Sequence, residues 1–270
     1  GGALTVGGSN TAIGDRALLA DTQGSNSVAI GRNALFAQNF TSATDTYNIA
    51  IGRDAGATIS TGTNNTLVGG QAGDAFTDGS SNTAMGRGAL STDTRGSKST
   101  AIGQDALNGQ NFTSATDSYN TAVGYSAGVS VSTGDKNTLI GMQAGDNITT
   151  GSNNTIVGAD AEPSAVDSSS EIVLGKATIG QGGSYFTFGK DNGSNRVYNQ
   201  FTSNATFTRV SDERYKEDIQ TNTDCGLDFI NDLRTVTFKF KALSDIPDTL
   251  PDYDAEATTP EHTNKLYGVI

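Results

Sequence analysis

The sequence predicts an all-β protein whose main part is a parallel β-solenoid, and three observations lead to this prediction. A motif of the form Asn-Thr-Ala-Ile-Gly recurs in ten copies at regular intervals along the chain. The residues before each glycine alternate between two faces, as Val28, Ala29 and Ile30 do, which is typical of a strand. The composition, with 34 glycines in 270 residues and no tryptophan, suits short strands joined by turns. Ten regular copies exclude a disordered chain.

Each copy is expected to form one coil, with a strand on each side and turns between the strands. The copies end at Gly14, Gly31, Gly52, Gly69, Gly86, Gly103, Gly124, Gly141, Gly158 and Gly175. Coils stack about 4.8 Å apart, so ten coils give a rod on the order of 45 Å long. Each coil has few apolar residues, so we expect partner chains to cover its remaining apolar face. The alternation leaves open whether the Ala29 face or the Ile30 face meets those chains.

Two coils, the one between Gly31 and Gly52 and the one between Gly103 and Gly124, are longer than the others. The segment Gln38–Asp45 of the first recurs unchanged at Gln110–Asp117 in the second, so a block of four coils is duplicated. We expect both inserts to bulge from one edge of the rod and to offer aromatic contacts to a host receptor. The alternative is that the rings cap the coils against the core. The predicted receptor-binding residues are Phe40, Tyr47, Phe112 and Tyr119.

The repeat resembles the head of trimeric autotransporter adhesins, whose coils carry Asn-Ser-Val-Ala-Ile-Gly. Residues 26–31 have this string in full, and the resemblance covers residues 1–175. It implies a trimer of left-handed β-rolls. With the ten copies of the motif, it predicts a shaft of ten coils over residues 1–175. The spacing between motif glycines here exceeds that of the adhesin coil, so longer turn loops are expected.

Residues 176–210 are expected to form a β-rich neck. Two aromatic, alternating runs, 184–188 and 196–199, flank Asn192-Gly193, a pattern that predicts a hairpin. A further extended run follows at 205–210.

Residues 211–270 have a different character and predict a small α+β module. A charged run opens at Ser211, and apolar residues at helical spacing predict a helix over 226–234. A strand is expected over 235–240 and a polar loop over 244–264, before another element begins at 266–270.

The opening string Ser-Asp-Glu-Arg-Tyr-Lys-Glu-Asp-Ile, at 211–219, resembles the C-terminal intramolecular chaperone domain of phage endosialidases and tailspikes. The resemblance implies that Ser211 is a nucleophile, that Lys216 is its base, and that the chain is cut between Val210 and Ser211. In that family the final string Tyr-Gly-Val-Ile leads into a further helix. We therefore expect residues 211–270 to be the N-terminal part of the module.

Charge and composition exclude several function classes. The net charge of −12 argues against nucleic acid as a partner, because phosphate neutralisation needs basic residues. No run of about 18 apolar residues predicts a membrane span, and the first residues are unlike a signal peptide. The single cysteine, Cys225, cannot form an internal disulfide. We expect no metal site and no cofactor.

These features together predict a structural, host-recognising tail fibre or tailspike of a bacteriophage, made in the host cytoplasm and found in the virion. Its expected partners are two further copies, a glycan or protein receptor on the host surface, and other tail proteins. The only expected chemistry is a single-turnover serine-lysine self-cleavage. Two alternatives remain open, a trimeric bacterial adhesin head and the non-catalytic stalk of a polysaccharide-degrading tailspike.

Overall fold

The computed structural model forms two compact units, Gly1–Ala205 and Thr206–Ile270, which are described separately. In the first unit the structure describes residues 2–191 and 195–200. In the second it describes residues 208–209, 216–221, 235–240, 242, 244 and 266–269.

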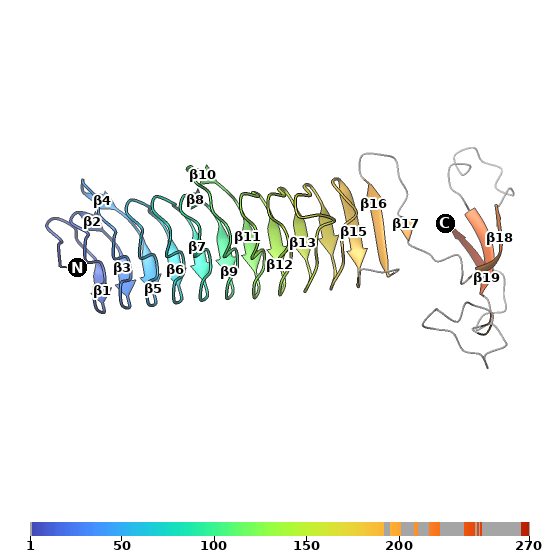
Figure 1. Cartoon of the computed structure of the whole chain (residues 1–270), viewed down its shortest axis with the longest axis horizontal. Coiled ribbons are helices and arrows are strands. Elements are labelled where there is room, and N and C mark those ends of the chain that lie inside the picture. Colours follow the sequence, from blue (N-terminus) through green and yellow to red (C-terminus); the bar gives the residue numbers. More distant parts are fainter. Residues whose placement is uncertain are drawn as a thin grey trace. The chain divides into compact units, whose positions relative to one another are not determined.

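A parallel sheet runs along the first unit, with one short strand from each coil (Figure 1). Neighbouring strands pair in register, so Ala29 lies beside Ala50 and Ile30 beside Ile51. The predicted β-solenoid is therefore confirmed. In sheet order its strands are β1 (Thr11–Ile13), β3 (Val28–Ile30), β5 (Ile49–Ile51), β6 (Thr66–Val68), β7 (Thr83–Met85), β9 (Thr100–Ile102), β11 (Thr121–Val123), β12 (Thr138–Ile140), β13 (Thr155–Val157) and β14 (Ile172–Leu174).

The motif glycine ends each of these strands in a conformation that other residues rarely adopt. At Gly86, for example, φ is 142°. A Cβ atom added there would lie 2.3 Å from the carbonyl oxygen of Gly103 in the next coil. The glycines therefore stack directly on one another, and this close approach explains why the motif always ends in glycine.

The expectation of a strand on each side of every coil is wrong. The segment after the motif glycine is a series of turns, in which residues with positive φ interrupt any extended run. Asn33 and Leu35 illustrate this, with φ values of 58° and 49°. Since every second residue turns the chain, this side of the coil closes by turns rather than by a strand ladder.

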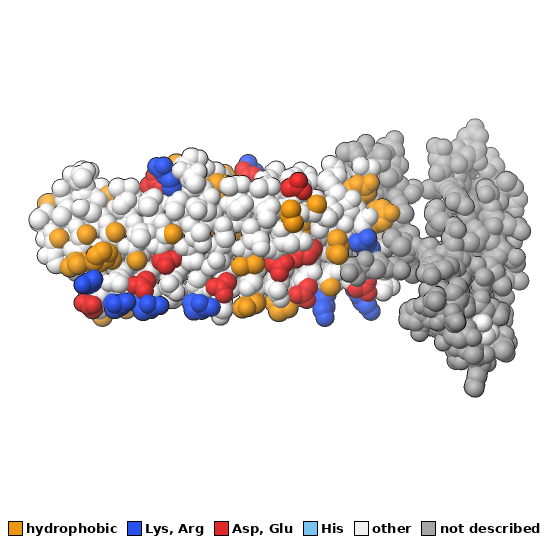
Figure 2. Space-filling model, in the orientation of Figure 1, with side chains coloured by type: hydrophobic (Ala, Val, Ile, Leu, Met, Phe, Trp, Pro, Cys, Tyr) orange, Lys and Arg blue, Asp and Glu red, His pale blue; other side chains and the backbone are white. Residues whose placement is uncertain are grey.

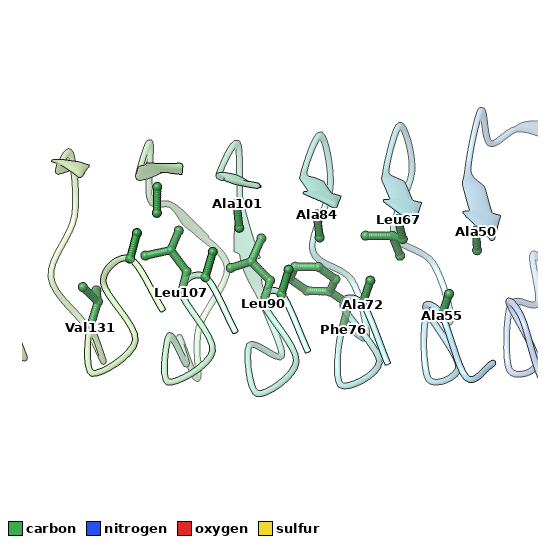
Figure 3. Packing of buried hydrophobic residues seen from close by; sticks show 14 of the residues in the cluster. Ala50, Ala55, Leu67, Ala72, Phe76, Ala84, Leu90, Ala101, Leu107 and Val131 are labelled. Carbon is green, nitrogen blue, oxygen red and sulfur yellow. The ribbon is translucent and has the colours of Figure 1, made fainter. Parts of the chain in front are cut away.

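The core lies between the strands and these turns. The middle residue is buried in every strand from β3 to β14 of this sheet, and Ala84 and Ala101 are fully buried; in β1, at the end of the shaft, Ala12 is exposed. Large side chains fill the space from the opposite wall, as Figure 3 shows for Phe76, Leu90 and Leu107. Small residues on the strand thus face larger ones on the turns, and a narrow coil is filled.

Buried asparagines connect successive coils just before the strands. The side-chain amide of Asn65 donates to the carbonyl oxygen of Gly79 at 2.9 Å. Its Oδ1 atom accepts the backbone N–H of Asn82, in the next coil, at 3.0 Å. Asn82, Asn120, Asn137 and Asn154 repeat this pair of bonds. The ladder satisfies backbone groups that would otherwise be buried without partners.

The neck contains the predicted hairpin. Strand β15 (Tyr185–Gly189) continues the parallel sheet beside β14 and pairs antiparallel with β16 (Arg196–Gln200). Residues 192–194, which include the predicted turn, lie outside the described residues.

In the second unit, β17 (Thr208–Arg209) comes first in the chain. An antiparallel sheet follows in the order β18 (Lys216–Thr221), β19 (Thr235–Phe240) and β20 (Leu266–Val269). The predicted strand over 235–240 is confirmed. The predicted helix over 226–234 lies outside the described residues.

Candidate functional site

The two inserts form matching projections on one edge of the shaft. Each contains a two-residue strand, β4 (Thr44–Asp45) or β10 (Thr116–Asp117), which pairs with β2 (Gly24–Ser25) or β8 (Gly96–Ser97). All four labels lie along the same edge in Figure 1, away from the long sheet. We call residues 38–47 the first ledge and residues 110–119 the second ledge.

A buried glutamine anchors each ledge to the shaft. In the first ledge, the Nε2 atom of Gln38 donates to Asp21 at 2.6 Å and to the Ser27 hydroxyl at 2.9 Å. Its Oε1 atom accepts from the amide of Asn48 at 2.8 Å. These residues are fully buried. Because Ser27 replaces an asparagine of the ladder, Gln38 fills the place that the shorter side chain leaves.

The second ledge repeats this network with Gln110. Its Nε2 atom donates to Asp93 at 2.6 Å, and its Oε1 atom accepts from Asn120 at 2.8 Å. Ser99 stands where Ser27 stands in the first ledge and also contacts Gln110. The two ledges therefore have closely similar bases, in which the buried Thr46 of the first is replaced by Ser118 in the second.

The four aromatic residues predicted to bind a receptor fall into two groups. Phe40 and Phe112 are only 7% exposed. Tyr47 and Tyr119 are 55% and 49% exposed. The burial of the phenylalanines agrees with the alternative that they cap the coils, so the tyrosines are the aromatics that can meet a ligand. Receptor binding itself stays a prediction.

Tyr119 is held by charged neighbours. The Nζ atom of Lys98 lies 2.6 Å from the carboxylate of Asp117, 3.2 Å from the Tyr119 hydroxyl and 5.2 Å from its ring centroid. The hydrogen bond from Lys98 lowers the pKa of Asp117, and the same bond raises the pKa of Lys98. Lys98 therefore remains a cation beside the hydroxyl end of the ring. Sequence reasoning missed this lysine, although it precedes the insert by one coil.

A second feature is the outer face of the long sheet. The third residue of every strand points outward, and all ten of these residues are apolar. We call them the outer stripe: Ile13, Ile30, Ile51, Val68, Met85, Ile102, Val123, Ile140, Val157 and Leu174. Met85 is 42% exposed and Ile140 40%. Figure 2 shows a band of hydrophobic side chains along the shaft, with charged residues beside it. Parallel sheets are normally covered on both faces.

Comparison with known proteins bears on the second unit. Residues 211–270 match the family model described as "Chaperone of endosialidase". The C-terminal segment is therefore similar in sequence to the endosialidase-type chaperone domain. Searches of curated proteins and of solved structures find no match to the chain. The matched residues, called the chaperone module below, include the string from which the resemblance was inferred.

The structure leaves the predicted cleavage site of the chaperone module undescribed. Val210 and Ser211 lie outside the described residues. Lys216 is the first residue of β18, and nothing is described of its side chain. The assignment of Ser211 as nucleophile and Lys216 as base therefore stays a prediction.

Two searches of the described residues gave no further site. That part of the chain holds no group of three or more His, Cys, Asp or Glu side chains placed to bind a metal ion. It also holds no helix of the length and apolar character needed to cross a bilayer.

Proposed function

We propose that the chain is the shaft of a homotrimeric bacteriophage tail fibre or tailspike, which attaches the virion to its host. The chaperone module at 211–270 would bring three chains together and then cut itself off before Ser211. The observation that carries this proposal is the outer stripe.

The outer stripe supports assembly because it gives copies of the chain a complementary surface. In a parallel assembly each coil meets the same coil of its neighbours, so apolar residues meet apolar residues along the whole shaft. Fully burying one aliphatic side chain is worth about 1.5–3 kcal/mol, and the stripe offers ten. Three is the number of chains in both families that the sequence resembles.

The chaperone match supports the same assembly by a kinetic argument. Because closely similar coils repeat at regular intervals along the shaft, two chains can pair one coil out of register with little loss of contact. A module at one end that gathers three chains raises their effective concentration and fixes the starting register. The repeated shaft thus needs such a module.

Host attachment is assigned to the edge that carries the ledges. Strands β4 and β10 lie at that edge, away from the long sheet (Figure 1), and we expect Tyr47 and Tyr119, each two residues before a strand of the sheet, to stay accessible when the stripe is covered. The partner there is a glycan or protein of the host surface. The ends of the shaft would join other tail proteins in the virion, after synthesis in the host cytoplasm.

Light scattering on the whole chain tests the assembly. The expected mass is three times 27.7 kDa, less any cleaved module. A double variant, Val68→Asp with Ile102→Asp, places charges in the outer stripe and should lower the average mass. The matched control, Ser42→Asp with Ser114→Asp, places the same charges on the exposed ledges and should remain trimeric. A wild-type mass of one chain, or a stripe variant that assembles like the control, would refute the proposal.

Attachment is tested separately by adding the fluorescently labelled protein to host cells. Saturable binding, and competition with virion adsorption, are expected. A trimer that binds no host cell would leave the assembly in place and remove the attachment role.

A further inference from the structure

We infer that the first ledge binds a neutral, hexose-type glycan on Tyr47, and that Lys98 prevents the second ledge from binding such a glycan on Tyr119. The inference rests on the proposed role in host attachment. It also names the ligand class and assigns different roles to two segments of nearly identical sequence.

The backbone at the two tyrosines is the first argument. Tyr47 and Tyr119 have φ values of 50° and 51°, in the left-handed region. The same column in the neighbouring coils holds small or flexible residues, such as Asn64 and Ser81, with φ near 60°. A bulky residue in this conformation is disfavoured, and half-exposed rings regain little through burial. Tyr119 is stabilised by its contacts with Lys98 and Asp117, whereas no side-chain contact is described for Tyr47, which indicates a role for Tyr47 at the surface.

The surroundings of the two rings differ in a consistent way. Three positions near the tyrosines are related by the duplication of the four-coil block, and at all three a neutral amide in the first ledge becomes a cation in the second. The pairs are Gln23 and Arg95, Asn26 and Lys98, and Asn64 and Lys136. In the second block each cation pairs with an aspartate: Arg95 with Asp78, Lys98 with Asp117 and Lys136 with Asp135. In the first block Asp45 has no Lys or Arg at the three matched positions, and this difference separates the two surfaces.

The cation beside the ring is the decisive difference. The Nζ atom of Lys98 lies 5.2 Å from the ring centroid of Tyr119, at the hydroxyl end of the side chain, and bonds the hydroxyl. Asn26 stands at the matching position in the first ledge, and its side-chain amide instead donates to Asp45 at 2.8 Å. Within residues 2–191, Tyr47 has no ring contact, ion pair or side-chain hydrogen bond. Tyr47 is therefore free of the cation that contacts Tyr119, while the two side chains are similarly exposed, at 55% and 49%.

The chemistry around Tyr47 suits a neutral sugar. The C–H groups of a pyranose ring can stack on an open aromatic face, which carries a partial negative charge. Sugar hydroxyls can donate to the exposed carboxylate of Asp45 and exchange hydrogen bonds with the amides of Asn26 and Asn64. An acidic sugar would meet the Asp45 carboxylate with no cation at the three matched positions. The first ledge therefore favours an uncharged glycan.

A glycan array tests the inference with the whole chain. The probes are immobilised neutral oligosaccharides of glucose, galactose, mannose and N-acetylhexosamines, and acidic ones containing uronic or sialic acid. Wild-type protein should bind neutral probes. Tyr47→Asn, which keeps a residue tolerant of positive φ, should weaken this binding by about tenfold or more. The matched control, Tyr119→Asn, should bind like wild type.

Exchange of the residue beside the ring gives a sharper test. Asn26→Lys should weaken binding to the level of Tyr47→Asn, because it gives the first ledge the cation of the second. Lys98→Asn should free Tyr119 of its cation and raise the number of bound oligosaccharides per chain from about one to about two, as measured by calorimetry. Melting temperatures of all four variants establish that each is folded.

Several results would overturn the inference. One is a Tyr47→Asn variant that is folded and binds as well as wild type. Another is binding restricted to acidic probes, and a third is attachment only to a protease-sensitive protein receptor. In each case a trimer that still binds host cells would leave the proposed function intact. If the protein bound no cells at all, the proposed function would fail first.

Discussion

Gly69 and Gly70 are neighbours in the chain, but the fold needs glycine at only one of them. Gly69 has a φ of 140°, and a Cβ atom there would lie 2.5 Å from the carbonyl oxygen of Gly86. At Gly70 the nearest atom to an added Cβ is 3.9 Å away. Other coils carry large residues at that position, such as Arg53 and Tyr125.

Alanine substitutions at the two glycines should therefore differ sharply. Gly69→Ala should destabilise the shaft by about 3 kcal/mol or more, because it combines backbone strain with a clash against the next coil. Gly70→Ala should leave stability unchanged or raise it by up to about 1 kcal/mol through the unfolded state. Urea unfolding followed by circular dichroism measures both. Equal midpoints for the two variants would contradict the stacked-glycine account.

Glu162 gives the shaft a predicted dependence on pH. Burial, and then a hydrogen bond to the nearby Asp146, raise the pKa of Glu162 from 4.5 to about 9. The folded state thus holds a proton that the unfolded state releases above its own lower pKa. The stability from this group is complete below about pH 4.5 and is lost as pH rises toward 9.

The variant Glu162→Gln should remove this part of the pH dependence. Glutamine keeps the shape and can still donate to Asp146, but it releases no proton on unfolding. Urea midpoints of wild type and variant, measured at intervals from pH 5 to pH 9, should diverge in favour of the variant as pH rises. Parallel curves over this range would show that Glu162 is ionised in the folded shaft.

At the scale of the element, the asparagine ladder joins coils that share only short strands. Replacing Asn65 by Ala leaves the carbonyl of Gly79 and the N–H of Asn82 each without one hydrogen-bond partner. We expect a loss of about 2–4 kcal/mol, because both groups are buried. The control is Asn64→Gly, at an exposed position with positive φ, which should cost less than about 0.5 kcal/mol. Similar losses in a denaturation experiment would argue against the ladder as a source of stability.

The strands were predictable from sequence because their signal is local. Alternation at Val28, Ala29 and Ile30 predicts a strand. The spacing of the motif glycines predicts which strands are its neighbours and in which register they pair. The alternation does not say which face is inside. That depends on residues such as Leu90 and Phe76, which reach across from the opposite wall and pack against the middle residues of the strands.

The turns and the ledges are features that local sequence patterns do not predict. Arg16 and Leu18 look like strand residues, but both have positive φ, because the coil has to close within a few residues. Gln38 lies in a polar insert, and its sequence context predicts a surface residue. It is buried because Ser27, in the coil before, is too short to continue the ladder. Neither outcome is contained in the segment itself, since each depends on the coil against which it packs.

At the scale of the whole molecule, the repeated shaft poses a kinetic problem that the chaperone module can solve. Most contacts in a solenoid assembly lie between distant residues or between chains, and such assembly is slow and prone to wrong register. A module that stays attached can also guide the reverse process, in which the chains separate and unfold. In the proposed trimer, cutting the module away after assembly would leave three chains with no template for separation, and the shaft would become kinetically stable.

The last prediction is that the full-length protein cuts itself before Ser211. A serine hydroxyl needs a base, and Lys216 can act as one where burial disfavours its charged form. Lys216 then takes the hydroxyl proton as the Ser211 oxygen attacks the carbonyl carbon of Val210. The peptide C–N bond breaks, the freed amine gains a proton, and an ester forms. Water hydrolyses this ester to the Val210 carboxylate and restores the Ser211 hydroxyl.

Intact-mass analysis and N-terminal sequencing of the full-length protein measure this cleavage. A new N-terminus at Ser211 is expected in the wild type and should be absent from Ser211→Ala and Lys216→Ala. Both variants should still assemble, because cutting follows assembly, but their trimers should dissociate faster in denaturant while the module remains attached. The control Lys241→Ala changes a lysine elsewhere in the module and should be cut normally. A folded wild-type trimer that remains uncut would remove the serine-lysine chemistry and leave the module a role in assembly alone.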